Sequence, residues 1–416
     1  MTDAASQKMP KILMIAYACN PEGGGEHWLG WGWAEQAAKN YSVHLITTSN
    51  TRAQVEKHAL LHGITPHFVE IPGSLRKISE RLGGVGSWWR KILWQSRVAQ
   101  FAAQLHRREH FQIVHQTTFH TFRVPFRGAE LGIPSVWGPV AGGESTPPGF
   151  GSYLGPARFG EATRKFINQI WLLVPGVARS LKNVSAIFVS NRTTLNFLPE
   201  AARSKCTVVS PNALRAEDEK NLANAKSKDA STKSLSLLYV GNCVHTRSMP
   251  IVFDALKLGR LDDCHLTVVG GGVALEHWKQ LVVTQNLSSK VTFTGPVTRE
   301  RLPGLYAAAD ALVFPALRDS GGSALLEAMS KGIPVICLDW GGPGEMVDDQ
   351  SGVKIPVTTP DETVAAFAEG LARLQRDPHW RTQLGERAIE RARSHFTWEA
   401  KRRLLETTYN RLLERQ

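Results

Sequence analysis

The sequence predicts an α/β protein made of two domains in tandem, each built on a parallel sheet. Apolar runs rich in Val, Ile and Phe alternate with helical patterns, and this rhythm is typical of parallel sheets with crossover helices. The length of 416 residues exceeds one ordinary core, and the polar stretch 213–234 interrupts the rhythm near the middle of the chain. We therefore expect one domain over residues 1–213 and a second over residues 214–395.

Thirteen runs rich in β-branched and aromatic residues are expected to form the strands. In the first domain they are KILMIAYA (11–18), SVHLITT (42–48), HFVEIP (67–72), FQIVHQ (111–116), IPSVWGPV (133–140), SAIFVSN (185–191) and CTVVSPN (206–212). In the second domain they are LSLLYVGN (235–242), CHLTVVGGG (264–272), KVTFTG (290–295), DALVFPA (310–316), IPVICLDWGG (333–342) and GVKIPV (352–357). A basic helical pattern at 396–416 could complete the second domain or pack back on the first.

The composition indicates a globular chain with an excess of positive charge. Hydrophobic residues make up 42%, and no stretch approaches the ~20 continuous apolar residues of a membrane span. The first ten residues lack the apolar segment of a secretory signal, and the five cysteines form no C-x-x-C pair. We therefore expect a cytoplasmic protein with reduced thiols. The formal net charge of +12 indicates an anionic partner, and nucleic acid, a lipid surface and phosphorylated substrates all qualify.

Two glycine-rich loops follow predicted strands, at places where helix N-termini favour anions. The first, NPEGGGEHWLGW (20–31), lacks the spacing of a dinucleotide fingerprint, so a tight turn and a ligand-facing loop both remain open. The second, VVGGG (268–272), lacks the Lys-Ser/Thr of a phosphate loop.

The stretch RDSGGSALLEAMSKG (318–332) places two acids around a Gly-Gly-Ser turn at the start of a helical pattern. The amides of 321–323 can face an anion, while Glu327 offers a carboxylate to paired hydroxyls. A phosphate beside a diol is the chemistry of a nucleotide sugar. The alternative is an ordinary surface helix, capped by Asp319 or Ser323.

Asp319 and Glu327, followed by AMSKGIPVI (328–336), resemble the E-x7-E motif of retaining glycosyltransferases of family 4. The resemblance implies a GT-B architecture, in which two Rossmann-like domains with parallel sheets face a central cleft. It implies that Glu327 holds the ribose hydroxyls. Asp319, shorter than the glutamate of the family, would lie near the donor sugar.

YVGNCVHTRSMPIVFDAL (239–256) is similar to the family segment whose two cations hold the diphosphate. Arg247 stands at the lysine position, whereas Asn242 replaces the arginine, so one cation is missing or comes from elsewhere. VTFTGPV (291–297) resembles the segment whose backbone contacts the base. GGPGEMV (341–347) matches another turn of the family and contains Glu345.

These motifs define the expected site residues. The donor-binding set is Gly24, Gly25, Asn242, Arg247, Thr294, Gly295, Val297, Asp319, Ser320, Gly321, Gly322, Ser323 and Glu327. The candidate catalytic residues are His115, His120, Arg247 and Asp319. Either histidine of FQIVHQTTFHTFR could meet the donor sugar, and each could instead be a hydrogen-bonded structural residue. Glu26 and Glu144 are expected on the acceptor side, in the first domain.

The implied reaction is a metal-independent, retaining sugar transfer. No D-x-D occurs and the histidines show no metal-ligand spacing, so we expect no cofactor beyond a nucleotide-diphosphate sugar of the UDP or GDP type. The expected acceptor is a glycan or lipid-linked molecule of the cell envelope. Two alternatives remain open: an inactive nucleotide-sugar-binding scaffold, and a sugar-nucleotide epimerase of similar fold.

Residues 76–108 concentrate cations and tryptophans in the first domain. Within them Trp94, Val98, Phe101 and Leu105 share one helical stripe, which predicts packing against the domain's own sheet. The other side chains could bind an anionic membrane surface, on the inner face of the cytoplasmic membrane. No nucleic-acid partner is expected, because no helix-turn-helix, zinc or RNP-type signature accompanies the charge.

Overall fold

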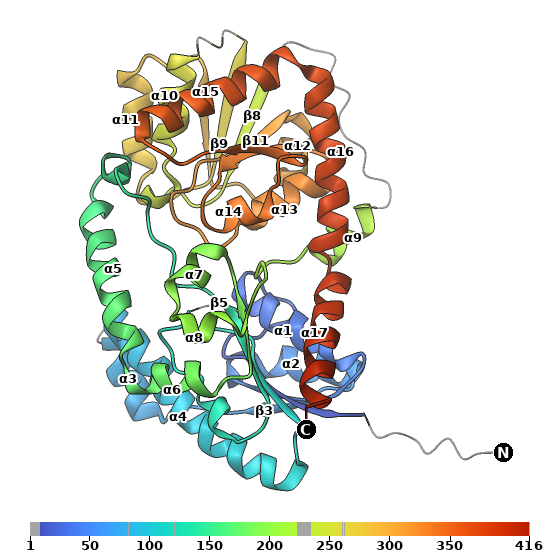
Figure 1. Cartoon of the computed structure of the whole chain (residues 1–416). Helices are drawn as coiled ribbons and strands as arrows, with labels where there is room; N and C mark the ends of the chain where they lie inside the picture. Colours follow the sequence, from blue (N-terminus) through green and yellow to red (C-terminus); the bar gives the residue numbers. More distant parts are fainter. Residues whose placement is uncertain are drawn as a thin grey trace, which may run out of the picture.

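The computed structural model describes residues 9–81, 83–119, 121–222, 234–259, 261 and 263–415. Two α/β domains lie one above the other, with the second domain at the top of Figure 1. The first sheet has the order β3-β2-β1-β4-β5-β6-β7 and the second the order β10-β9-β8-β11-β12-β13. All pairings are parallel, and the predicted α/β class with two Rossmann-like sheets is confirmed.

Each of the thirteen expected runs overlaps a strand. The first sheet holds β1 (Lys11–Ile15), β2 (Ser42–Thr47), β3 (Thr65–Phe68), β4 (Ile113–Gln116), β5 (Ser135–Val140), β6 (Ala186–Val189) and β7 (Cys206–Val208). The second sheet holds β8 (Leu235–Val240), β9 (Cys264–Val269), β10 (Val291–Gly295), β11 (Ala311–Phe314), β12 (Val335–Leu338) and β13 (Gly352–Ile355). β3 begins two residues earlier than expected, because its pairing with β2 starts at His44 and Thr65.

Helices cover both faces of each sheet. They are α1 (Glu26–Ala38), α2 (Arg52–His62), α3 (Gly73–Arg81), α4 (Gly83–Glu109), α5 (Ala157–Leu172), α6 (Pro175–Asn183), α7 (Arg192–Phe197), α8 (Glu200–Arg203), α9 (Ala216–Leu222), α10 (Pro250–Leu258), α11 (Leu275–Thr284), α12 (Leu302–Ala308), α13 (Ser323–Ser330), α14 (Gly341–Met346), α15 (Pro360–Arg376), α16 (Pro378–His395) and α17 (Trp398–Leu413). Among the described residues, no helix combines the length and the apolar content needed to cross a bilayer.

Successive side chains along the strands of the first sheet face opposite sides of the sheet. On β1, Ile12 and Met14 face the cluster with α1 and α17, whereas Leu13 and Ile15 face the cluster with α4 and α6. Trp94 and Val98 of α4 are buried in that second cluster, so the predicted packing stripe of residues 76–108 is confirmed.

Two segments cross between the domains. The chain ends in α17, which packs against α1 of the first domain, so the last two helices run along one flank of both domains (Figure 1). Gly32 makes this packing possible, because a Cβ there would lie 2.0 Å from the Trp398 ring. On the other side, Phe150 and Leu154 are buried in the core of the second domain, although they precede α5 within the predicted first domain.

Candidate functional site

A pocket of about 220 Å³ lies between the domains at the switch points of the two sheets. In open parallel sheets, ligands bind where the strand order reverses, outside the carboxyl ends of the strands. Arg247 follows β8 and the Gly321–Gly322 turn follows β11, the two strands that flank the reversal in the second sheet. The remaining lining residues are Gly25, Trp28, Leu29, Asn212, Ala213, Leu214, Arg215, Asp218, Ser323, Leu326 and Glu327.

Two expected catalytic residues meet at the pocket. Arg247 forms an ion pair with Asp319, and its guanidinium lies 4.5 Å from the centre of the Phe314 ring. Burial lowers the pKa of Arg247 from its ordinary value, because the charged form loses hydration. The second carboxylate oxygen of Asp319 accepts a hydrogen bond from the Gly321 amide at 2.8 Å. The ion pair therefore joins the loop after β8 to the loop after β11.

Glu327, the expected ribose ligand, lies on α13 with one oxygen already occupied. The Tyr306 hydroxyl donates to Glu327 Oε2 at 2.9 Å. Tyr306 is buried, and burial together with the Glu327 charge raises its pKa well above the ordinary value, so it stays a donor. Glu327 is thus oriented by a residue that no sequence motif indicated. No hydrogen bond among the described residues reaches its Oε1, which can therefore accept from a ligand.

The polar interdomain stretch supplies part of the pocket wall, which sequence reasoning missed. Ala213, Leu214, Arg215 and Asp218 line the pocket, and residues 223–233 of the stretch lie outside the described residues. A Cβ built on Gly24 would lie 3.5 Å from Nη2 of Arg215, so this cation lies beside the glycine loop. Its position in a polar, linker-like segment gave no signal of this role.

The glycine-containing loops of both domains contribute backbone rather than side chains. Gly25 has a φ of 58° and precedes the first turn of α1, which explains why a glycine is needed there.

Asn212 donates from Nδ2 to the Gly321 carbonyl at 2.8 Å, which ties the interdomain connection to the turn before α13. Ser320 is half-buried and Ser323 is exposed at the first turn of α13.

Four expected donor residues lie away from this pocket. Asn242 is exposed after β8, where its carbonyl accepts from the Tyr239 hydroxyl at 2.9 Å. Thr294 and Gly295 end β10, the edge strand two positions from β8, and Val297 follows it. They lie at the carboxyl end of the sheet but outside the pocket that holds Glu327.

His115 lies in the interior of the first domain and is not brought to the cleft. Its Nδ1 lies 2.6 Å from the Tyr409 hydroxyl and its Nε2 lies 2.9 Å from the Gly138 carbonyl oxygen. The ring is fully buried, and burial lowers its pKa to about 4. The proposed catalytic role of His115 is therefore incompatible with its position, and its structural alternative fits. His120 lies outside the described residues.

The two acids expected on the acceptor side are engaged with the protein itself. Glu26 accepts from the Phe119 amide at 2.7 Å and so holds the turn after β4. Glu144 is buried and accepts from the Gly142 amide, Asn191 Nδ2 and Thr194 Oγ1 at 2.8, 3.0 and 3.2 Å. Its carboxylate therefore shapes the loop after β5 instead of facing a substrate.

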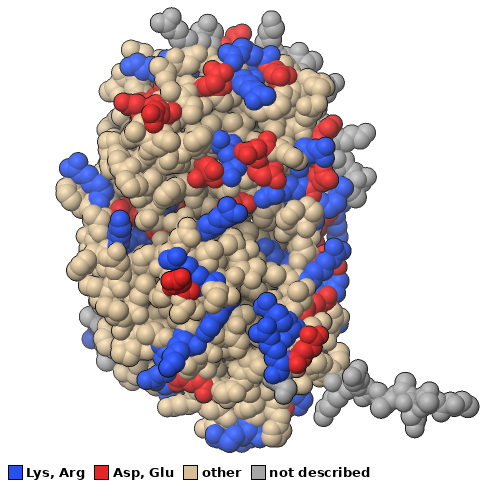
Figure 2. Space-filling view, viewed as in Figure 1, with Lys and Arg blue, Asp and Glu red and all other residues tan. Residues whose placement is uncertain are grey.

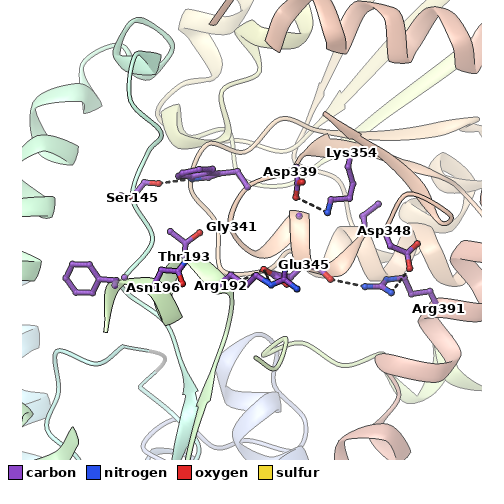
Figure 3. A pocket seen from close by; sticks show the side chains of 15 residues that line it. Ser145, Arg192, Thr193, Asn196, Asp339, Gly341, Glu345, Asp348, Lys354 and Arg391 are labelled. Carbon is purple, nitrogen blue, oxygen red and sulfur yellow. Dashed lines mark hydrogen bonds and ion pairs between the residues drawn. The ribbon is translucent and has the colours of Figure 1, made fainter. Parts of the chain in front are cut away.

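A larger pocket, of about 620 Å³, opens between α7 and α14 (Figure 3). Its six charged side chains form three pairs: Lys354 with Asp339, Arg391 with Asp348, and Arg192 with Glu345, at 2.9, 2.6 and 3.6 Å. Trp340 donates from Nε1 to the Ser145 carbonyl at 2.8 Å, which joins the two domains. None of the expected donor-binding residues lines this pocket.

The second domain matches a known protein family. Residues 221–393 match the family model of glycosyl transferases group 1. A D-inositol 3-phosphate glycosyltransferase of Frankia alni is 36% identical over 189 residues, which are 42% of this chain and 45% of that protein. The corresponding protein of Corynebacterium diphtheriae is 33% identical over 141 residues, 34% of this chain and 32% of that protein. The matches thus span less than half the length of these relatives.

Solved structures share the fold of the whole chain. A glycosyltransferase from Rickettsia africae superposes with a TM-score of 0.62 at 14% identity, over 98% of this chain and 100% of that one. Anabaena HepE in complex with UDP gives a TM-score of 0.61 at 16% identity, over 97% of this chain and 100% of that one. These likenesses extend over both domains, and the expected GT-B architecture is confirmed.

Proposed function

We propose, from the match of residues 221–393 to the family model of glycosyl transferases group 1, that this chain transfers a sugar from a nucleotide-diphosphate donor to an acceptor. One observation carries the proposal: Glu327, Arg247 and the Gly321–Gly322 turn converge on one pocket at the switch points of both sheets. A carboxylate, a guanidinium and backbone amides match a ribose diol beside a diphosphate. The family relatives named above are themselves glycosyltransferases.

The leaving diphosphate would be stabilised by cations and amides of the chain itself. Arg247 provides one cation, and Arg215, beside the glycine loop, provides the second that Asn242 does not supply. Preorganised donors around a developing charge lower the barrier to its departure, especially in a partly desolvated site. We propose that transfer needs no metal and retains the anomeric configuration, with the donor of the UDP or GDP type.

The acceptor is proposed to be a glycan or lipid-linked molecule of the cell envelope, at the inner face of the cytoplasmic membrane. Residues 76–108 support this with Lys77 and Arg81 exposed on α3 and Trp89, 56% exposed, on α4. Lys91 contributes less, since its Nζ lies 5.3 Å from the Trp88 ring centre and is half-buried. The side chain of Arg76 lies outside the described residues.

The test combines binding and product analysis. Titration calorimetry with UDP, GDP and ADP should identify one preferred nucleotide, and incubation of the matching sugar nucleotides with envelope lipid extracts should yield a glycosylated product. Nuclear magnetic resonance of the product should show the donor's anomeric configuration. Tight nucleotide binding without any transfer would favour the scaffold, and a released epimer would favour the epimerase. Lack of nucleotide binding would overturn the proposal.

A further inference from the structure

Helix α5 is amphipathic in the opposite sense to an ordinary surface helix. Three of its polar side chains face the protein. Asn168 is buried and donates from Nδ2 to the Gly142 carbonyl at 2.8 Å. Arg164 donates to the same carbonyl at 3.0 Å and lies 3.6 Å from Glu144. Glu161 pairs with Arg318 of the second domain at 2.9 Å. The inner face is therefore fixed by polar contacts.

The outer face of α5 carries large apolar side chains instead. Phe159, Phe166, Ile170 and Leu173, the last at the end of the helix, are 68%, 63%, 48% and 78% exposed. Their spacing of seven, four and three residues places them on one stripe of the helix. Large apolar side chains that gather on one exposed surface mark an interaction site. Figure 1 shows α5 on the outer, left flank of the molecule.

The charges around this stripe are positive. Arg158 and Lys165 are exposed, and Glu161, the single acid of α5, is turned inward to Arg318. On the left flank in Figure 2, tan surface over α5 carries several blue side chains. An apolar stripe bordered by cations is the pattern of a helix that lies in the interface of an anionic bilayer.

We propose that α5 is the element by which this protein inserts into an anionic lipid surface. A second copy of the chain fits the stripe less well. In a two-fold contact the patch would pack against itself, and its cations would meet cations because α5 exposes no acid. Anionic headgroups supply the missing negative charge, while acyl chains cover the phenylalanines.

The surface continues onto the basic segment of the first domain. The rings of Trp88 on α4 and Trp171 on α5 lie 6.0 Å apart, so the two helices are in contact. Trp89, next to Trp88, is itself exposed. The α5 stripe thus adds the apolar part to a surface for which the sequence indicated only cations and tryptophans.

The position of α5 also connects the lipid surface with the cleft. Phe150 and Leu154, just before α5, are buried in the second domain, and Trp171 near its end donates from Nε1 to the Arg123 carbonyl at 2.5 Å. Arg318, the partner of Glu161, directly precedes Asp319. A bilayer bound at α5 would therefore lie next to the donor site. The lipid binding proposed for α5 would bring the enzyme to the proposed membrane-side acceptor. It rests on that proposed function only for its biological purpose.

The test measures vesicle binding without nucleotide. Full-length protein is sedimented with phosphatidylcholine vesicles that contain one third phosphatidylglycerol, and with neutral vesicles. Wild type should bind the anionic vesicles, and the double variant Phe166→Ser/Ile170→Ser should bind them at least tenfold more weakly. Arg158→Gln/Lys165→Gln should weaken binding to anionic vesicles. The matched control is Leu60→Ser/Leu61→Ser, two side chains exposed by 86% and 72% on α2, which should bind as wild type does.

Three outcomes would overturn the inference. They are no binding of wild type to anionic vesicles, equal binding of the α5 variants and wild type, and an equal loss in the α2 control. Sedimentation velocity tests whether a second copy of the chain covers the stripe instead. A wild-type dimer that dissociates in the α5 variant would assign the stripe to that second copy. UDP titration of each variant verifies that the donor site is intact. Failure of vesicle binding with intact UDP binding would leave the proposed transferase function standing.

Discussion

Arg247 and Asp319 form an ion pair across the pocket between the loops after β8 and β11. The Asp319 carboxylate is thus paired with the same guanidinium that, by the family resemblance, would bind the donor diphosphate. A diphosphate that enters the site must therefore compete with Asp319 for Arg247. The roles of Arg247 and Asp319 can therefore be separated by substituting each residue in turn.

Asp319→Asn should bind UDP at least as tightly as wild type but turn over more slowly. The substitution removes the charge that pairs with Arg247, while Oδ1 of the asparagine can still accept from the Gly321 amide. The slower turnover follows from the weaker contact with the donor sugar. Calorimetry and initial rates measure the two effects, and a loss of UDP affinity would show that Asp319 supports nucleotide binding instead.

Arg247→Ala should lower turnover more than Arg247→Lys, because lysine keeps the charge and loses only the planar fork. Arg215→Ala should also lower turnover if it supplies the second cation at the diphosphate. The double variant Arg215→Ala/Arg247→Ala should be slower than either single variant. Lys257→Ala, at an exposed position on α10, is the control for loss of a surface cation. Unchanged rates for Arg215→Ala would exclude it from the site.

Glu327→Ala should weaken UDP binding by roughly 1.5 to 3 kcal/mol, the scale of hydrogen bonds to a charged group. Tyr306→Phe should weaken it less, because only the orientation of the carboxylate is lost. Calorimetry with UDP and with the free base distinguishes a ribose contact from a general effect. If Glu327→Ala binds UDP as wild type does, Glu327 does not hold the ribose.

His115 should make the protein less stable in acid. Its pKa is lowered to about 4 in the folded protein, against about 6.5 in the unfolded chain, so the unfolded chain binds the proton more readily. The stabilisation is complete above pH 6.5 and is lost as the pH falls toward 4, a change of up to about 3 kcal/mol. Urea unfolding of His115→Gln across this range should show a shallower pH dependence than wild type. His379→Gln, at an exposed position on α16, should keep the wild-type slope.

Transfer should continue in EDTA. If Arg247, Arg215 and backbone amides hold the diphosphate, chelation removes nothing that the reaction needs. Initial rates with and without EDTA, and with Mg²⁺ or Mn²⁺ added back, measure this. A complete loss that either ion restores would show that a metal takes part.

The sequence by itself determined the two-sheet architecture, since alternation of apolar runs and helical patterns specifies parallel strands locally. It also located Arg247, Asp319 and Glu327, because each lies in a short motif next to a strand end. These features depend on neighbours within a few positions of the chain. The thirteen expected runs all overlap strands for the same reason.

Only the tertiary structure decided which side chains those motifs meet. His115 was a catalytic candidate by its place after a strand, but Tyr409, 294 positions later, buries it. Tyr306 and Arg215 reach the pocket from segments without a motif, because long-range packing and not local pattern brings them there. The orientation of α5 is also a tertiary result. Its sequence allows an apolar stripe to face either way, and Glu144, Gly142 and Arg318 hold its polar face against the protein.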